Sequence, residues 1–207
     1  MKNEVLFLLF DRYADHESVF VTAGINCEET QMRENPKYVV KTVAPDLQPV
    51  CSCGGFHTVP DYSIDTMPTD YAALILIGGY GWLDERMADR VVPIVKDAID
   101  KGRIVGAICN AASFLAKHGF LNDVKHTGNG LEQLRLWGGD NYRNEAGYIN
   151  SQAVCDGRIV TANGTGALEF AKELLLLLEV DTPEWIERFY QFNKLGFVEM
   201  MRMMRQG

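Results

Sequence analysis

Short apolar runs separated by longer amphipathic stretches divide the 207-residue chain into alternating segments. Continuous apolar runs of this kind are typical of strands that are covered on both faces. They predict strands over 4–10, 38–44, 71–77 and 104–108. Helical spacing of apolar positions predicts helices over 18–25, 84–101, 111–116, 131–137 and 167–178. Because the strands alternate with helices, we expect a doubly wound, mostly parallel α/β sheet flanked by helices on both faces.

Turn residues add two hairpins and a C-terminal helix. Gly54-Gly55 separates two short β-like runs within 50–59, and Asp156-Gly157 lies between 148–154 and 158–162. Thr182-Pro183-Glu184 has the pattern that opens a helix. We expect one α/β domain over 1–180 and a helical extension over 181–207. The extension carries several large aromatic side chains, which predicts a homodimer or packing against the chain's own domain.

Composition narrows the class of protein. The net charge of −8 and the absence of a Lys/Arg-rich patch argue against nucleic acid as a partner. No apolar run is long enough for a signal peptide or a membrane span, so we expect a cytoplasmic protein. Five cysteines, an odd number, fit reduced thiols. Cys51 and Cys53 lack the spacing of a metal site and are expected to be hairpin residues; neither a metal nor a cofactor is predicted.

Cys109 is the strongest candidate for chemistry. It stands between the apolar run 104–108 and the Ala-rich helical run 111–116, with the small residues Gly106 and Ala111 nearby. This pattern predicts a nucleophile elbow, in which helix N-terminal N–H groups favour the thiolate. A buried structural thiol is the alternative interpretation, because cysteine is among the most buried residue types.

Two further strand ends carry residues that we expect to meet Cys109, because ligands in such folds bind at the carboxyl ends of the strands. The segment 11–17 follows the first strand, and Gly78-Gly79-Tyr80-Gly81 follows the strand over 71–77. The glycines would let the backbone approach a ligand closely. A tight turn without any ligand explains them equally well.

The chain also resembles the ThiJ/PfpI superfamily, within the class I glutamine-amidotransferase-like fold (a flavodoxin-like three-layer sandwich). The resemblance extends from about residue 4 to residue 180. The matching segments, in order, are 4–11 with Glu17 shortly after, 70–79, 105–116, 119–122 and 159–164.

The resemblance implies site residues around Cys109. Glu17 matches the acid that lies beside the nucleophilic sulfur; a residue interacting with the helix dipole is the alternative. The N–H groups of Gly79 and Asn110, with Gly78 beside them, would form an oxyanion hole. The family histidine falls nearer Asn129 in a gap-free alignment, and a small loop shift would bring His126 to the thiol instead. A loop histidine without a catalytic role is the alternative for His126.

The region that carries the second His of a glutaminase triad, 161–170, contains Glu169 but no histidine, so glutamine amidotransfer is not expected. The resemblance implies a cysteine-dependent hydrolase or lyase of the glyoxalase or deglycase type. Its substrates would be small reactive carbonyls or their adducts, or, with less support, peptide-like molecules. Two alternatives stay open: a redox or stress sensor that uses the same thiol, and a ligand-binding domain without catalysis.

Overall fold

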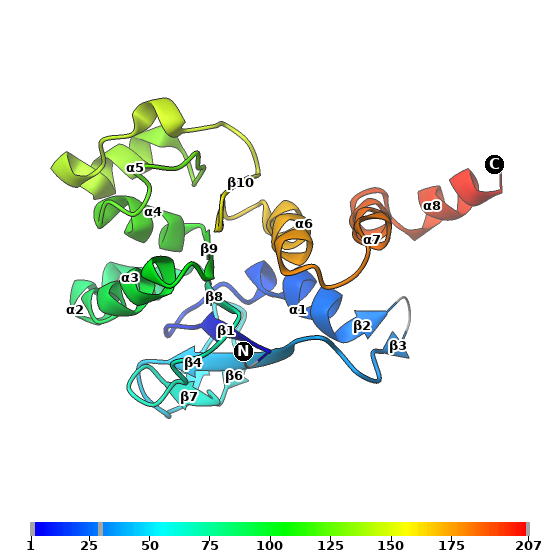
Figure 1. The fold of residues 1–207 in the computed structure, drawn as a ribbon, viewed down its shortest axis with the longest axis horizontal. Helices are drawn as coiled ribbons and strands as arrows, with labels where there is room; N and C mark the ends of the chain where they lie inside the picture. Colours follow the sequence, from blue (N-terminus) through cyan, green and yellow to red (C-terminus); the bar gives the residue numbers. More distant parts are fainter. Residues whose placement is uncertain (1–2, 29–30, 206–207) are drawn as a thin grey trace.

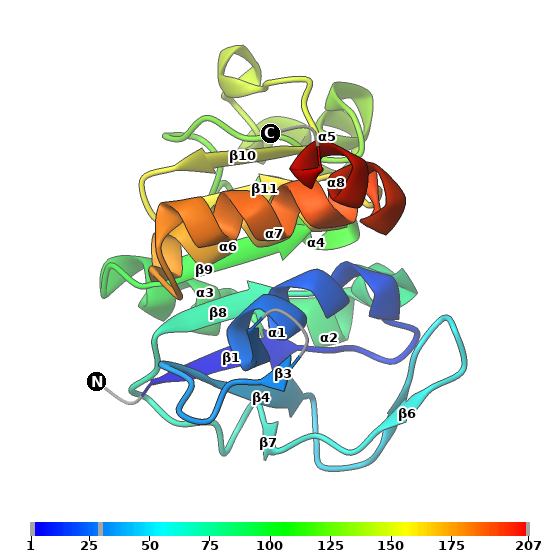
Figure 2. The ribbon, with the colours of Figure 1, turned by 90° about the vertical axis from the view of Figure 1, so that its right-hand side faces the viewer.

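A twisted central sheet forms the core of the computed structural model, which describes residues 3–28 and 31–205 (Figures 1 and 2). Seven strands are hydrogen-bonded in the order β10-β11-β9-β8-β1-β4-β7. Their bounds are β1 (Glu4–Leu8), β4 (Val39–Ala44), β7 (Tyr62–Ser63), β8 (Ala73–Leu76), β9 (Ile104–Ile108), β10 (Ala153–Asp156) and β11 (Ile159–Ala162). Only the β10–β11 pairing in this sheet is antiparallel. The predicted mostly parallel sheet is confirmed.

Helices cover both faces of the sheet, as Figure 1 shows with the sheet seen edge-on. One face carries α1 (Val19–Asn26) and α6 (Ala167–Leu178), with α7 (Pro183–Leu195) packed on α6. The other face carries α2 (Glu85–Asp89), α3 (Val92–Asp100), α4 (Asn110–Lys117) and α5 (Leu131–Gly138). Among the residues described, no helix is both long and apolar enough to cross a bilayer.

The strands are apolar throughout because both faces are buried. In β1, Val5 and Phe7 pack into the core on the α1–α6 side, whereas Leu6 and Leu8 pack into the core on the α3–α4 side. All four side chains are at most 1% exposed. A strand between two helical layers must have apolar residues at both alternating sets of positions, and this explains the continuous runs seen in the sequence.

Short elements complete the fold. Two small antiparallel pairs are β2 (Cys27–Glu28) with β3 (Gln31–Met32), and β5 (Val50–Cys51) with β6 (His57–Thr58). The 3-10 helices are η1 (Asp15–Glu17), η2 (Tyr80–Leu83), η3 (Gly139–Asn141) and η4 (Glu145–Gly147). The hairpins predicted around Gly54-Gly55 and Asp156-Gly157 are confirmed.

The single helix predicted over 84–101 is wrong. Asp84 does cap α2, accepting hydrogen bonds from the N–H groups of Arg86 and Met87, but α2 ends at Asp89 and α3 begins at Val92. Pro93 stands in the first turn of α3, where its missing N–H costs nothing, but within a continuous helix it would leave the Asp89 carbonyl without its donor.

The C-terminal extension consists of two helices, because Gly196, with φ 83°, separates α7 from α8 (Phe197–Met204). Intramolecular packing covers its first turn: Trp185 and Ile186 are buried, and Trp185 stacks on Phe189 at 5.4 Å between ring centroids. Phe197 keeps 62% of its surface exposed, and α8 extends beyond the body of the domain (Figure 1). The homodimer remains a prediction.

Candidate active site

Four strand ends converge on the Cys109 thiol. Cys109 follows β9, Glu17 lies after β1, Gly78 after β8 and Gly164 after β11. A methyl group at Gly78 would lie 2.6 Å from both Cys109 Cβ and Glu17 Oε2. One at Gly164 would lie 3.0 Å from Cys109 Sγ and 3.4 Å from Glu17 Oε1. Both glycines therefore pack directly against the Cys109–Glu17 pair, and the predicted convergence of strand ends is confirmed.

Cys109 has the strained backbone of a sharp strand-to-helix turn. Its φ of 61° and ψ of −126° are unfavourable for a residue with a side chain. The turn is held by hydrogen bonds from Cys109 N–H to Ala162 O and from Ala112 N–H to Cys109 O. The Asn110 N–H, the first in α4, donates to the sulfur. This geometry places a half-buried thiol at a helix N-terminus, as the elbow pattern predicts.

Glu17 is a buried acid bonded to the thiol. Its side chain is 1% exposed, Oε2 accepts a 2.7 Å hydrogen bond from the Gly78 N–H, and a further hydrogen bond joins the carboxyl to Cys109. Burial raises the pKa of Glu17 from its ordinary value of 4.5 to about 7, outweighing the lowering by these bonds and by His16. The carboxyl therefore changes protonation near neutral pH.

Cys109 and Glu17 influence each other's pKa. Burial raises the pKa of Cys109, and the negative charge of ionised Glu17 raises it further, whereas hydrogen bonds from Asn129 and Asn110 lower it. Since two adjacent negative charges repel each other, the pair loses its protons in two coupled steps. After the first step it holds one proton, on Glu17 or on Cys109. Of these two forms, the one with the thiolate and a neutral Glu17 is the nucleophilic one.

Asn129 is a site residue that the motif analysis did not assign to the site. Its Nδ2 donates to Cys109 Sγ at 3.3 Å, and its Oδ1 accepts from the Gly164 N–H at 2.8 Å. It lies twenty positions after Cys109, where the gap-free alignment pointed. The polar stretch Gly128-Asn129-Gly130 carried no chemical signal of its own, because an amide is neither an acid nor a base.

His126, expected to assist the thiol, is not brought to it. The residue is fully buried, with Nδ1 at 2.8 Å from Val124 O and Nε2 at 2.7 Å from Tyr142 Oη. Burial lowers the pKa of His126, which favours the neutral ring. Because the carbonyl only accepts, Nδ1 donates to it and Nε2 accepts from the tyrosine hydroxyl. Both ring nitrogens are thus occupied by hydrogen bonds within the 124–142 segment.

Replacing His126 with alanine is therefore expected to affect stability and not thiol reactivity. The free energy of unfolding should fall by about 1–3 kcal/mol, because the buried Tyr142 hydroxyl loses its acceptor. The alkylation rate of Cys109 by iodoacetamide should stay within about twofold of wild type. Tyr142→Phe, which removes the hydroxyl alone, is the matched control. A tenfold slower alkylation in a folded His126→Ala protein would place the imidazole in the site.

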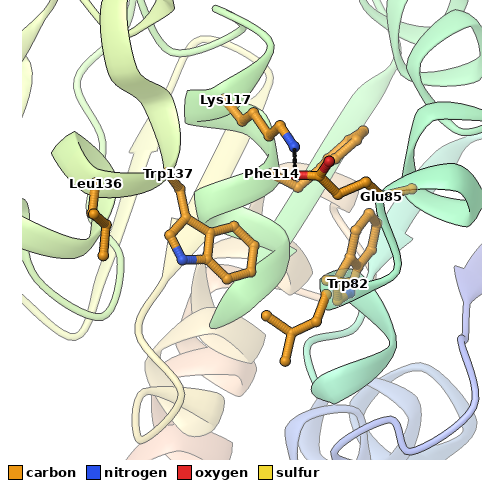
Figure 3. Close-up of a pocket in the computed structure, with 8 residues that line it drawn as sticks. Trp82, Glu85, Phe114, Lys117, Leu136 and Trp137 are labelled. Atoms are coloured by element: carbon orange, nitrogen blue, oxygen red, sulfur yellow. Dashed lines mark hydrogen bonds and ion pairs between the residues drawn. The ribbon is translucent and has the colours of Figure 1, made fainter.

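A separate cavity lies beside α4, away from the thiol. It has a volume of about 300 Å³ and is lined by side chains of η2, α2, α4 and α5, among them Trp82, Phe114 and Trp137 (Figure 3). An ion pair between Lys117 Nζ and Glu85 Oε1, at 2.6 Å, lies at its edge. Neither Cys109 nor Glu17 lines it. Among the described residues, no group of three or more His, Cys, Asp or Glu side chains is placed to hold a metal ion.

Several known proteins are similar to this chain in sequence or in fold. A Bacillus subtilis protein named "Uncharacterized protease YdeA" is 38% identical over 195 residues, which cover 94% of this chain and 92% of the relative. The crystal structure of a ThiJ/PfpI family protein from Bacillus anthracis has a TM-score of 0.86 at 31% identity and covers 94% of this chain and 91% of that one. The "Glutathione-independent glyoxalase DJR-1.2" of Caenorhabditis elegans is 26% identical over 134 residues, covering 64% of this chain and 69% of the relative.

The model of one protein family matches nearly the whole α/β part of the chain. It is described as the DJ-1/PfpI family, and the match covers residues 3–177, a range that includes Glu17, Cys109 and Asn129. With the sheet, the elbow and the relatives described above, this identifies the family that the sequence pattern resembled. The chain belongs to the DJ-1/PfpI family.

Proposed function

We propose that the chain is a cysteine-dependent enzyme that converts small reactive carbonyls, with α-oxoaldehydes such as methylglyoxal as the substrate class. One observation carries the proposal: the thiol of a strained elbow cysteine is hydrogen-bonded to a buried carboxyl whose pKa is raised to about 7. A nucleophile and a proton carrier that works near neutral pH are the two groups that such a conversion needs.

The reaction begins from the Cys109 thiolate and the protonated Glu17. The sulfur bonds to the aldehyde carbon, the carbonyl π pair moves to oxygen, and that oxygen takes the Glu17 proton to give a hemithioacetal. The Glu17 carboxylate then removes the hydrogen of the same carbon as a proton, the hydroxyl proton passes to the neighbouring carbonyl oxygen, and Glu17 returns its proton to the neighbouring carbon. The product is a thioester: one carbon has been oxidised by two electrons and its neighbour reduced by two.

Water closes the cycle. It adds to the thioester carbonyl with Glu17 as the base and proton acceptor. The C–S bond then breaks, a 2-hydroxy acid leaves, and the Cys109 thiolate and the protonated Glu17 are restored. We propose that the N–H groups of Gly79 and Asn110 stabilise the negative oxygen in each addition, with Gly78 leaving room beside the sulfur. The Asn110 N–H is the first of α4, so the helix dipole adds to its effect.

The test is turnover of methylglyoxal in D₂O without added thiol. We expect a 2-hydroxy acid that carries deuterium at carbon 2, because a proton held by Glu17 exchanges with solvent before it is returned. If no acid forms, the proposed activity is wrong. If the acid forms without deuterium and Glu17→Gln still forms it at the wild-type rate, the shuttle assigned to Glu17 is wrong.

The names of the relatives point to two reactions, and the site favours one. DJR-1.2 is named a glyoxalase and YdeA a protease. Cleaving a peptide bond requires protonation of a leaving amine, a step usually served by a histidine that is hydrogen-bonded to the nucleophile. The side chains bonded to Cys109 are Glu17 and Asn129, and His126 is committed elsewhere. Carbonyl conversion needs no amine leaving group.

Oxidation sensing is the second candidate, favoured by the same buried acid. Oxidation of Cys109 to a sulfinic acid by peroxide would place its oxygens beside the Glu17 carboxyl, whose O–H would donate to them. Mass spectrometry after mild peroxide treatment tests this. Selective oxygen addition at Cys109, with Cys53 unmodified, supports sensing; because Cys53 is exposed, equal oxidation of both would count against it.

A further inference from the structure

We propose that Asn129 is the positioning residue of the nucleophile: its amide holds the Cys109 sulfur and the Gly164 loop together, and leaves Glu17 as the side chain that exchanges protons with the thiol. The proposal rests on the nucleophilic role of Cys109 in the proposed function. It assigns a role to Asn129, which the proposed function does not use.

The orientation of the Asn129 amide is determined by its two partners. The Gly164 N–H can only donate, so the atom 2.8 Å from it must be the carbonyl oxygen of Asn129. The NH₂ group therefore points the other way, toward Cys109 Sγ at 3.3 Å. A flipped amide would put two donors against each other at Gly164 and an oxygen against the sulfur. The sulfur thus receives a fixed neutral donor.

The same amide anchors the loop that closes over the sulfur. Gly164 lies so near that a methyl group on it would be 3.0 Å from Sγ. The loop is also held from its other side, where Thr165 N–H donates to Asn163 Oδ1 and Asn163 Nδ2 donates to Ser151 O. Asn129 is the link between this loop and the nucleophile, so one side chain sets both the position and the accessible face of the thiol.

An amide donates a hydrogen bond but does not take up a proton near neutral pH, whereas an imidazole in the same place would do both. The proton of Cys109 therefore moves to Glu17 or to solvent. No other titratable side chain described around Cys109 and Glu17 takes over the role of Glu17 as proton acceptor. His16 is exposed and acts on Glu17 through its charge, Asp15 is bonded to Ser52 Oγ, and His126 is bonded to Tyr142.

Two substitutions at Asn129 distinguish its two roles, as a hydrogen-bond donor to the sulfur and as an anchor of the Gly164 loop. Asn129→Ala removes the donor and the loop anchor. Asn129→Asp keeps an oxygen for the Gly164 N–H and replaces only the donor, by a negatively charged oxygen. The readout is the pH dependence of Cys109 alkylation by iodoacetamide, which requires no substrate. We expect Asn129→Ala to slow alkylation at pH 7 about tenfold, because the thiolate loses a hydrogen bond. Asn129→Asp should slow it further and shift the rise in rate to higher pH.

Two further variants serve as controls. Asn35→Asp introduces the same charge at an exposed loop position and should leave the profile unchanged. His16→Gln should move the profile only slightly and remove no titration step. Alkylation profiles of Asn129→Ala and Asn129→Asp that coincide with wild type would overturn the proposal, and so would loss of a titration step in His16→Gln. Altered profiles in a protein that converts no carbonyl would refute the proposed activity and leave the assignment of Asn129 standing.

Discussion

Replacing Glu17 with glutamine is expected to stabilise the protein at pH 8 while lowering its turnover. Glutamine keeps an oxygen for the Gly78 N–H but carries no charge. The pKa of Glu17 is raised from 4.5 to about 7 because burial penalises the ionised carboxyl. By linkage, its stabilising effect is fully present below pH 4.5 and is lost as the pH rises through about 7. Above that pH the wild-type protein carries a penalty of up to about 3 kcal/mol that the variant lacks.

The measurement is the free energy of unfolding by urea at pH 5 and pH 8. Glu17→Gln should exceed wild type at pH 8 and come close to it at pH 5. Glu184→Gln, at an exposed position of α7, removes a charge without touching a buried group and should show no such difference. A variant that is less stable than wild type at pH 8 would mean that ionised Glu17 is well accommodated in the fold, contrary to the raised pKa.

Turnover of the same variant is expected to fall by about 10²–10⁴-fold, the usual contribution of a general acid–base group. Glutamine can still donate a hydrogen bond to the sulfur through its NH₂, but it can neither give nor remove a proton. The loss should therefore appear in kcat more than in KM, measured on methylglyoxal. A gain in stability accompanied by unchanged kcat would separate the buried acid from the chemistry.

Cys109→Gly and Cys109→Ala are expected to abolish turnover but to differ in stability. Either change removes the nucleophile, so the rate should fall by at least about 10³-fold. The backbone of Cys109 has φ 61°. Alanine keeps the strain of that conformation, whereas glycine adopts it freely. After allowing for the greater freedom of glycine in the unfolded chain, we expect Cys109→Gly to be about 1 kcal/mol more stable than Cys109→Ala.

Each variant is the matched control for the other, because the two differ by one methyl group. Thermal or urea unfolding at one pH gives the difference directly. If Cys109→Ala proves the more stable of the two, the elbow stores no backbone strain. If either variant retains turnover near the wild-type rate, a group other than the Cys109 thiol attacks the carbonyl.

Much of the fold could be predicted because the sheet is buried on both faces. Continuous apolar runs at 4–10 and 71–77 have few interpretations in a chain of this length, and Asp156-Gly157 is a strong turn signal. The edge strand β7 was missed, since a two-residue parallel pairing with β4 leaves no hydrophobic pattern in the polar stretch 61–68. The break between α2 and α3 was missed because apolar spacing continues across it while Pro93 interrupts the hydrogen bonds.

Some residues of the candidate site could likewise be predicted from the sequence, and others could not. Cys109 could be found because a strand running into a helix leaves a pattern, and Glu17 because the resemblance to the ThiJ/PfpI superfamily implies an acid at this position. Asn129 and Gly164 could not, since their roles depend on two loops that meet only in the folded chain. His126 was expected at the thiol because the resemblance implies a histidine near position 129, which a small loop shift would make His126. Its burial against Tyr142 is a long-range contact that spacing does not reveal.

The pH dependence of Cys109 alkylation in wild type and in Glu17→Gln tests the central claim most directly, namely that thiol and carboxyl share a proton. In wild type we predict two steps: a partial rise in rate near pH 7, when the pair loses its first proton, and a second rise at higher pH as both groups ionise. Glu17→Gln should show a single step. Wild-type and variant curves that superimpose would contradict the account, because the carboxyl would then have no influence on the thiol.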